Sequence, residues 1–104
     1  FELLNQAYNY AKSKGMDVKV GNILASDTFY NDDYGIDPYQ KWRDFGVMVV
    51  EMESAALYTL AAKYGRKALT LLTVSDSLVT GEKCSAEERQ LTFTEMMEIA
   101  LEIA

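Results

Sequence analysis

The sequence predicts an α/β domain with parallel strands, and three observations lead to that class. Two apolar runs, 47–50 and 67–74, have the length and composition of strands that are buried on both faces. The stretch between them, 54–64, is rich in good helix formers. A strand, a helix and a second strand in this order predict parallel strands joined by a crossover helix. The 104 residues are enough for one domain with a modest core.

Two elements are predicted before the first apolar run. Apolar residues at positions 1, 4, 8 and 11 have helical spacing and predict a helix over 1–14, ended by Gly15. Residues 18–25 alternate apolar with smaller or polar side chains, which predicts a strand with an interior glycine, Gly21.

A loop rich in Asn, Asp and Gly is predicted over 26–38, followed by a short helix near 39–45. Its acidic residues suggest a calcium loop, but they lack the ligand order and terminal glutamate of an EF-hand. A solvated loop is therefore the preferred interpretation. The acidic and aromatic stretch 30–42 is compatible with a lid over a site or with a subunit contact, and the sequence leaves both open.

Two helices complete the predicted order. The helix over 54–64 is apolar almost all round and ends at Gly65, so it is predicted to be mostly buried. Ser85 and Glu88 form a capping box that opens a long final helix. The apolar stripe of that helix is predicted to be core, and it consists of Phe93, Met96, Met97, Ala100, Leu101 and Ala104.

Composition excludes several classes of function. Without histidine there is no Ser-His-acid triad, no Cys-His pair and no set of ligands for most transition metals. A net charge of −6 disfavours binding to nucleic acid. No apolar stretch is long enough to span a bilayer, and no signal peptide is evident. Cys84 is the single cysteine, which makes the cytoplasm the default compartment. A chain that opens at Phe1 within a predicted helix is expected to be a fragment.

Acidic residues follow both apolar runs. Glu51 and Glu53 end the first and Asp76 ends the second, so we expect three carboxylates beside one crevice, because ligands of open α/β sheets bind at the carboxyl ends of strands. Glu51 ends a buried strand, so it requires a partner or a polar ligand. Glu53 is equally compatible with a helix N-terminal acid, and Asp76 with an ordinary turn aspartate. Arg89 is the nearest plausible cation for Asp76.

Four segments resemble the bacterial, high-molecular-weight type of purine nucleoside phosphorylase. They are Val-Glu-Met-Glu-Ser-Ala at 50–55, Thr-Val-Ser-Asp at 73–76, Thr-Gly-Glu at 80–82 and Glu-Glu-Arg-Gln at 87–90, and the likeness extends to 21–30. Uridine phosphorylases and methylthioadenosine nucleosidases are similar at the first segment alone. The later segments favour the purine phosphorylase.

The resemblance implies a three-layer αβα fold of the nucleoside phosphorylase type with a central mixed sheet. Residues 1–104 would form the C-terminal part of that single domain, without the N-terminal part that binds phosphate. The implied partners are purine nucleosides and phosphate as co-substrate, with no metal or redox cofactor, in a cytoplasmic homohexamer (a trimer of dimers) that serves purine salvage. The isolated chain is expected to be inactive.

The resemblance also implies roles on the nucleoside side of the site. Val50, Glu51 and Met52 would line the nucleoside pocket. Glu53 would bind the ribose hydroxyls, a role suited to a carboxylate acceptor. Phe29 would pack against the purine.

Two further residues would face the purine base, and a third would act through one of them. Ser75 and Asp76 would lie beside it, with Asp76 as the general acid that protonates N7, assisted by Arg89. A permanent ion pair would favour loss of the Asp76 proton, so Arg89 is predicted to engage only when substrate binds. Ser77 and Leu78 depart from the His-Ile that often follows in the family. The alternatives are a hydrolytic nucleosidase and an inactive fragment that binds nucleoside or is purely structural.

Overall fold

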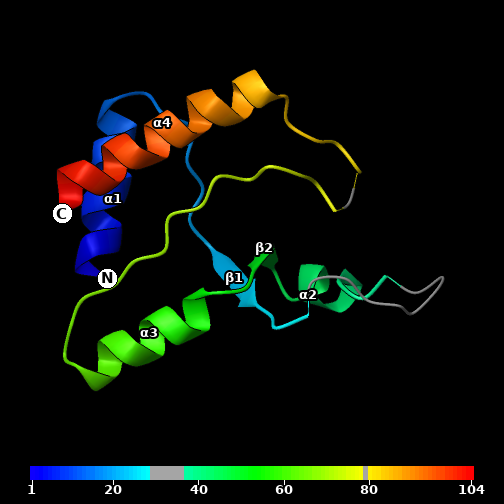
Figure 1. Ribbon diagram of the computed structural model, residues 1–104, viewed down its shortest axis with the longest axis horizontal. Helices are drawn as coiled ribbons and strands as arrows, with labels where there is room; N and C mark the ends of the chain where they lie inside the picture. Colours follow the sequence, from blue (N-terminus) through cyan, green and yellow to red (C-terminus); the bar gives the residue numbers. More distant parts are fainter. Residues whose placement is uncertain (29–36, 79) are drawn as a thin grey trace. The chain divides into compact units, whose positions relative to one another are not determined.

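The computed structural model describes residues 1–28, 37–78 and 80–104. Their elements, in chain order, are α1 (Glu2–Ser13), β1 (Asn22–Ala25), α2 (Gln40–Asp44), β2 (Val47–Glu51), α3 (Ser54–Lys63) and α4 (Ala86–Ile103) (Figure 1). The chain forms two compact units. The first comprises Phe1–Val18 with Leu69–Ala104, and the second comprises Lys19–Ala68.

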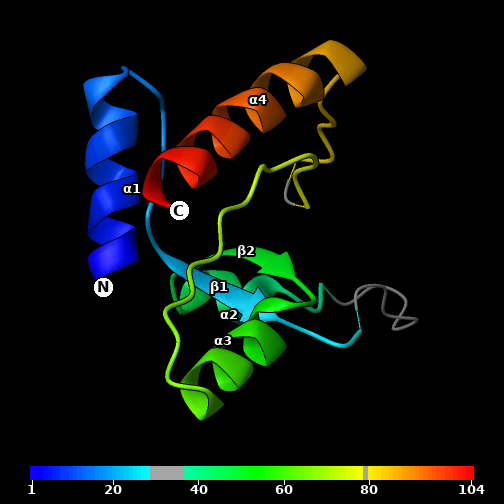
Figure 2. The ribbon, with the colours of Figure 1, turned by 60° about the vertical axis from the view of Figure 1, so that its left-hand side comes forward.

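The second unit is built on a parallel pair of strands. β1 and β2 lie side by side, with Leu24 opposite Val50 and Ala25 opposite Glu51 (Figure 2). Gly21 directly precedes β1, and a Cβ there would overlap the side chain of Met48, so the glycine permits a close approach at the start of the pair. β1 covers Asn22–Ala25, so it is shorter than the strand predicted over 18–25. Because the two strands are parallel, both carboxyl ends lie at one edge, although the predicted parallel pair was 47–50 with 67–74.

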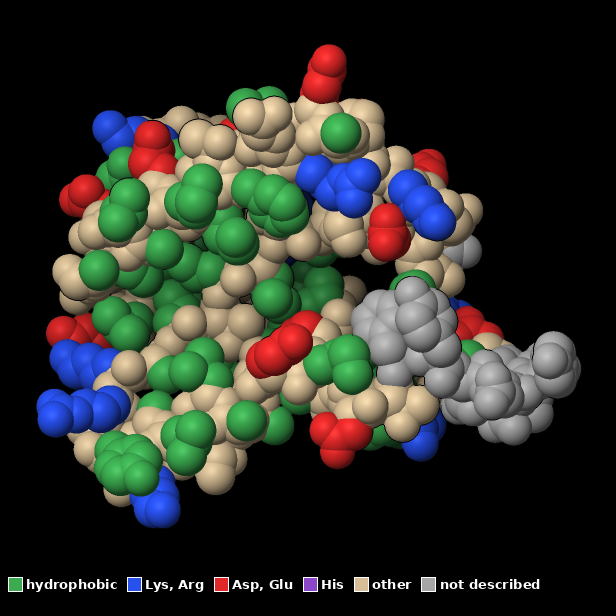
Figure 3. Space-filling model, in the orientation of Figure 1, with side chains coloured by type: hydrophobic (Ala, Val, Ile, Leu, Met, Phe, Trp, Pro, Cys, Tyr) green, Lys and Arg blue, Asp and Glu red, His purple; other side chains and the backbone are tan. Residues whose placement is uncertain are grey.

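The helix predicted over 54–64 is present as α3, and Gly65 ends it with a φ of +60°. The prediction that this helix is mostly buried is wrong for this chain. Within α3 the buried residue is Ser54, whereas Leu60 is 54% exposed and Leu57 is 44% exposed. The described sheet has two short strands, which is too little surface to cover a helix that is apolar on all sides. Hydrophobic side chains are accordingly plentiful on the surface (Figure 3).

The first unit has its core between α1 and α4, which pack against each other (Figures 1 and 2). Ala7 and Ala11 of α1 meet Ile99 of α4, and all three are buried. The small alanines let the two helices approach closely. Partly buried hydrophobic residues surround this cluster, namely Tyr10, Met16, Val18, Leu69, Leu71 and Ile103.

The apolar run 67–74 is not a strand in this structure, so the predicted strand-helix-strand unit is not formed by it. Residues 71–78 nevertheless alternate between partly buried and exposed positions, as in a strand with one covered face. Leu71 lies against the α1–α4 core, while Leu72 and Val74 are 43% and 56% exposed. Among the described residues the run forms no ladder with a second strand, and such a ladder is what defines a strand in a sheet.

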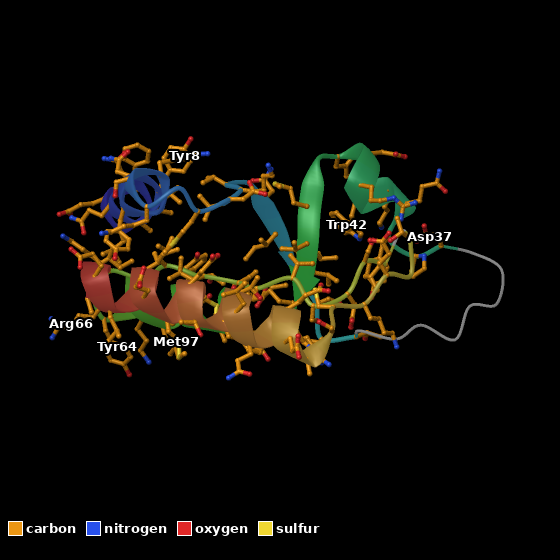
Figure 4. All side chains as sticks on the ribbon, turned by 90° about the horizontal axis from the view of Figure 1, so that it is seen from above. Tyr8, Asp37, Trp42, Tyr64, Arg66 and Met97 are labelled. Carbon is orange, nitrogen blue, oxygen red and sulfur yellow. The ribbon has the colours of Figure 1, made fainter. Side chains whose placement is uncertain are left out.

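The prediction that the apolar stripe of the last helix is core is wrong for most of its residues, which are exposed. Phe93, Met97 and Leu101 are 42%, 55% and 80% exposed, and Met97 projects from the side of α4 that is turned away from α1 (Figure 4). The buried face is instead the one that carries Ile99 and, one turn later, Ile103. Because α4 is apolar on more than one face, the sequence pattern did not distinguish the face that packs. Within the described residues, no helix has the length and apolarity needed to cross a membrane.

Candidate active site

The turn between β2 and α3 holds the first group of predicted site residues. Glu51 ends β2, and its Oε2 atom accepts hydrogen bonds from the backbone N–H groups of Glu53 at 2.8 Å and Ser54 at 2.7 Å. The opposite strand is tied to the same place, because the Ser26 N–H donates to the Glu51 carbonyl at 2.9 Å. One carboxylate therefore satisfies two amide groups that the start of a helix leaves without an intrahelical partner.

These hydrogen bonds control the charge of Glu51. Desolvation by burial opposes the charged form, but the N–H groups of Glu53 and Ser54, together with the Ser54 side chain, outweigh it and lower the pKa of Glu51. The second oxygen, Oε1, is buried and accepts no hydrogen bond from any described residue. The predicted need for a partner is thus met at one oxygen, while the other keeps its acceptor capacity.

The neighbours of Glu51 differ in exposure. Val50 is half-buried in β2, and Met52 is 45% exposed in the turn. Glu53 precedes the first residue of α3, and its Oε2 atom accepts a hydrogen bond from the Met52 N–H at 3.1 Å. A carboxylate here is favoured by the positive end of the helix dipole. Glu53 therefore has the position of an acid at the N-terminus of a helix, which is the structural role considered for it. Its second carboxylate oxygen can still accept a hydrogen bond from a hydroxyl group.

Asp76 lies in a short hairpin made of residues 75–78 and 80–84, hereafter the 75–84 hairpin. The Cys84 N–H donates to the Ser75 carbonyl and the Ser77 N–H donates to the Glu82 carbonyl, each at 2.8 Å. These bonds flank an antiparallel bridge between Asp76 and Lys83. The backbone on both sides of Asp76 is thus fixed, while its exposed carboxylate forms no hydrogen bond or ion pair with the described residues.

Ser75 and Arg89 share a second feature of the first unit, an open hollow of about 620 Å³. Ser75 lines it from the extended segment, and α4 supplies Ala86, Arg89, Gln90, Phe93, Thr94 and Met97. Arg89 lies four residues after Ser85, whose hydroxyl accepts the Glu88 N–H at 3.1 Å, so the predicted N-cap is confirmed. The hollow combines a cation, hydroxyl and amide groups with apolar side chains, so it offers both polar and apolar contacts to a ligand.

The structure brings some predicted site residues together. Val50, Glu51, Met52 and Glu53 are consecutive at the sheet edge of the second unit, and Ser75 lies beside Arg89 in the first. Among the described residues no ion pair joins Asp76 to Arg89. The gathering of Glu51, Glu53 and Asp76 at one crevice stays a prediction, because these residues belong to different units. Phe29 lies outside the described residues, as do the acidic residues Asp32 and Asp33 of the predicted loop.

Five residues that line the hollow were not predicted as site residues: Ala86, Gln90, Phe93, Thr94 and Met97. Helical spacing could have found them, because positions three, four, seven and eight residues after 86 and 89 share one face of a helix. Phe93 and Met97 had instead been predicted as core.

Residues 1–104 match the family described as the Phosphorylase superfamily. The chain belongs to this superfamily. It is 61% identical to the "Purine nucleoside phosphorylase DeoD-type" of Clostridium novyi, 64% identical to that of Caldanaerobacter subterraneus and 56% identical to that of a Geobacillus strain. Each alignment covers the whole chain, and it covers 44%, 44% and 43% of the relative, respectively.

Membership of the phosphorylase superfamily confirms both the predicted resemblance and the predicted α/β fold class of the nucleoside phosphorylase type. The described helices and the small parallel sheet agree with that class. The chain spans less than half the length of the curated relatives it matches, so their names describe proteins more than twice as long.

Proposed function

We propose that this chain supplies the nucleoside side of the active site of a purine nucleoside phosphorylase. The observation that carries the proposal is the identity of 61% to 64%, along the whole chain, with proteins of that name. The reaction is phosphorolysis of purine ribonucleosides or deoxyribonucleosides to a free base and a pentose 1-phosphate. The names of the relatives favour this reaction over hydrolysis by a nucleosidase.

Asp76 is the proposed general acid. An oxygen of phosphate attacks C1′ while the C1′–N9 bond breaks, and the electron pair of that bond passes to the purine. The Asp76 carboxyl group donates its proton to N7, which neutralises the charge that develops on the leaving base. Phosphate loses a proton to solvent when it forms the new bond to C1′. Asp76 then regains a proton from solvent, so the number of protons balances. The exposed carboxylate is not engaged by the described residues, so it is accessible to a bound base.

The remaining residues bind and orient the nucleoside. Val50, Glu51 and Met52 line its pocket, and the free oxygen of Glu53 accepts hydrogen bonds from the ribose hydroxyls. Glu51 serves through its buried Oε1 atom, which is the acceptor left open at the sheet edge.

Three residues contact the base or act next to it. Ser75 faces the purine and Arg89 assists Asp76 once substrate is bound; their shared hollow supports both roles. The role of Phe29 in packing against the purine rests on the sequence resemblance alone. The reaction uses no metal or redox cofactor, and the complete enzyme is a cytoplasmic homohexamer in purine salvage.

The test is an assay of the protein expressed from its complete coding sequence. Cleavage of adenosine and inosine is measured with and without phosphate, for the wild type and for Asp76→Asn. We expect base release that requires phosphate. We expect a larger loss for adenosine than for inosine in the variant, because Asp in place of Asn at this position resembles enzymes that accept 6-amino as well as 6-oxo purines. Asp44→Asn, the same change at an exposed position at the end of α2, is the matched control and should retain wild-type rates. Cleavage without phosphate would move the assignment to a nucleosidase.

A further inference from the structure

The position of Asp76 is set by the backbone of the 75–84 hairpin and not by contacts of its own side chain. The hydrogen bonds from Cys84 to Ser75 and from Ser77 to Glu82, both 2.8 Å, hold the residues on either side of it. Between them Asp76 and Lys83 form a pair that faces across the bridge without bonding to each other. Any loosening of the hairpin therefore moves the Asp76 carboxyl group directly.

Ser77 is the residue that closes this hairpin. Its carbonyl accepts the Gly81 N–H at 2.9 Å, and its Oγ atom accepts the Thr80 N–H at 3.1 Å. Its own N–H makes the bond to Glu82 described above. Ser77 thus uses its N–H, its carbonyl and its hydroxyl within one turn, and it is adjacent to Asp76 in the chain.

The rest of the turn depends on this closure. Thr80 continues it through its Oγ1 atom, which accepts the Glu82 N–H at 3.2 Å. Gly81 has a φ of +75°, a conformation that glycine adopts without steric cost. A serine hydroxyl that bonds to a backbone N–H three residues ahead is a common way to stabilise a turn. The hydroxyl of Ser77 therefore stabilises the turn through a hydrogen bond that an alanine cannot form.

We propose that Ser77 is a positioning residue for the general acid Asp76. This inference rests on the proposed function. A general acid accelerates the reaction only when it lies within hydrogen-bond reach of the atom that it protonates. A displacement of about 1 Å can lower a rate about 100-fold. Loss of the Ser77 hydroxyl should therefore lower kcat while leaving KM nearly unchanged, because the affected contact forms in the transition state.

The experiment uses the protein from its complete coding sequence and measures kcat and KM for adenosine at saturating phosphate. Ser77→Ala is made alone and together with Asp76→Asn. If Ser77 acts through Asp76, Ser77→Ala lowers kcat about 10-fold or more in the wild type and has no further effect in the Asp76→Asn background. The control is Ser13→Ala, which removes a serine hydroxyl bonded at 2.7 Å to the Tyr10 carbonyl of α1, and it should leave kcat unchanged.

A second variant covers the case in which Ser77→Ala does not fold. Thr80→Val removes the hydroxyl that accepts the Glu82 N–H and should lower kcat in the same way, again with no further effect when Asp76 is already Asn. An unchanged kcat in the folded variant would overturn the inference, and so would an equal loss in both backgrounds. If the wild type shows no phosphate-dependent cleavage, the proposed function fails and this inference fails with it. A wild type and an Asp76→Asn variant that behave as proposed, beside an unaffected Ser77→Ala, would overturn the inference alone.

Discussion

Glu51 and Asp76 each follow an extended apolar segment, and the structure treats their carboxylates differently. Glu51 gives one oxygen to the backbone N–H groups of Glu53 and Ser54, at 2.8 and 2.7 Å, and so helps to start α3. At Asp76 the hairpin fixes the flanking backbone, while the carboxylate has no partner among the described residues. The Glu51 carboxylate therefore stabilises the fold. The Asp76 carboxylate is attached to a fixed backbone and remains able to contact a ligand.

This difference distinguishes a hydrogen-bond acceptor from a proton donor, two roles that the sequence alone did not assign to one carboxylate or the other. The hydrogen bonds that lower the pKa of Glu51 keep it charged at neutral pH, so it is suited to accept hydrogen bonds and not to donate a proton. A general acid has to carry a proton when substrate binds. Of the two residues, Asp76 is the one whose carboxylate the described residues leave unengaged, so the proposed proton transfer is assigned to it.

The largest expected effect comes from removing each carboxylate in turn. Glu51→Ala should lower the free energy of unfolding by about 2 kcal/mol, because two backbone N–H groups lose a charged acceptor. Asp76→Ala, the matched change, should alter it by less than about 0.5 kcal/mol. Chemical unfolding of the protein from its complete coding sequence measures both values. Amide hydrogen exchange at Glu53 and Ser54 should accelerate in the first variant only. A larger loss of stability for Asp76→Ala would reverse the comparison.

A smaller effect is expected at the end of the 75–84 hairpin, where Ser85 caps α4. Its hydroxyl accepts the Glu88 N–H at 3.1 Å, so Ser85→Ala should lower the free energy of unfolding by about 1 kcal/mol. Ser85→Asp, which restores a side-chain acceptor at the N-cap, should recover most of that loss. Thermal unfolding of the two variants beside the wild type is the measurement. Equal stability of Ser85→Ala and the wild type would show that the cap contributes nothing.

Local signals in the sequence predicted local structure well. The helix-ending glycines Gly15 and Gly65 have φ of +71° and +60°, and Ser85 is the N-cap that its spacing from Glu88 indicates. Each of these features depends on a few neighbouring residues, so the chain specifies it without help from distant parts. The order of helices followed from the same kind of evidence, whereas the parallel pair that forms, β1 with β2, is not the pair that was predicted.

Features that depend on long-range packing were predicted less well. The run 67–74 has the composition of a buried strand, yet pairing requires a second strand that composition cannot guarantee. Phe93 and Ile99 are both apolar residues of α4, and only contact with Ala7 and Ala11 determines that Ile99 is the buried one.

The acid range of pH should also distinguish Glu51. Because its pKa is lowered in the folded protein, its charge stabilises the fold above the ordinary glutamate pKa, and this contribution is lost as pH falls through the lowered value. The stability difference between the wild type and Glu51→Gln should therefore be constant above the ordinary glutamate pKa of about 4.3 and shrink as pH falls below it. Urea unfolding at a series of pH values measures it. A difference that grows on acidification would show that the charge of Glu51 is not used by the fold.

The smallest expected effect on stability concerns the contact between α1 and α4, where a carboxylate accepts one long hydrogen bond. The Tyr10 hydroxyl donates to Glu98 Oε2 at 3.4 Å, and partial desolvation together with the charges of Glu98 and Glu102 raises the pKa of Tyr10. A raised pKa means that the protonated phenol contributes to stability below the ordinary tyrosine pKa of about 10 and that this contribution disappears as pH rises through the raised value. The stability difference between the wild type and Tyr10→Phe should thus be present at pH 8 and decline above pH 10. Glu98→Gln, which removes the acceptor charge, should weaken that decline. Thermal unfolding at pH 8 and pH 11 tests both, and a difference that is equal at the two pH values would mean that Tyr10 and Glu98 merely lie near each other.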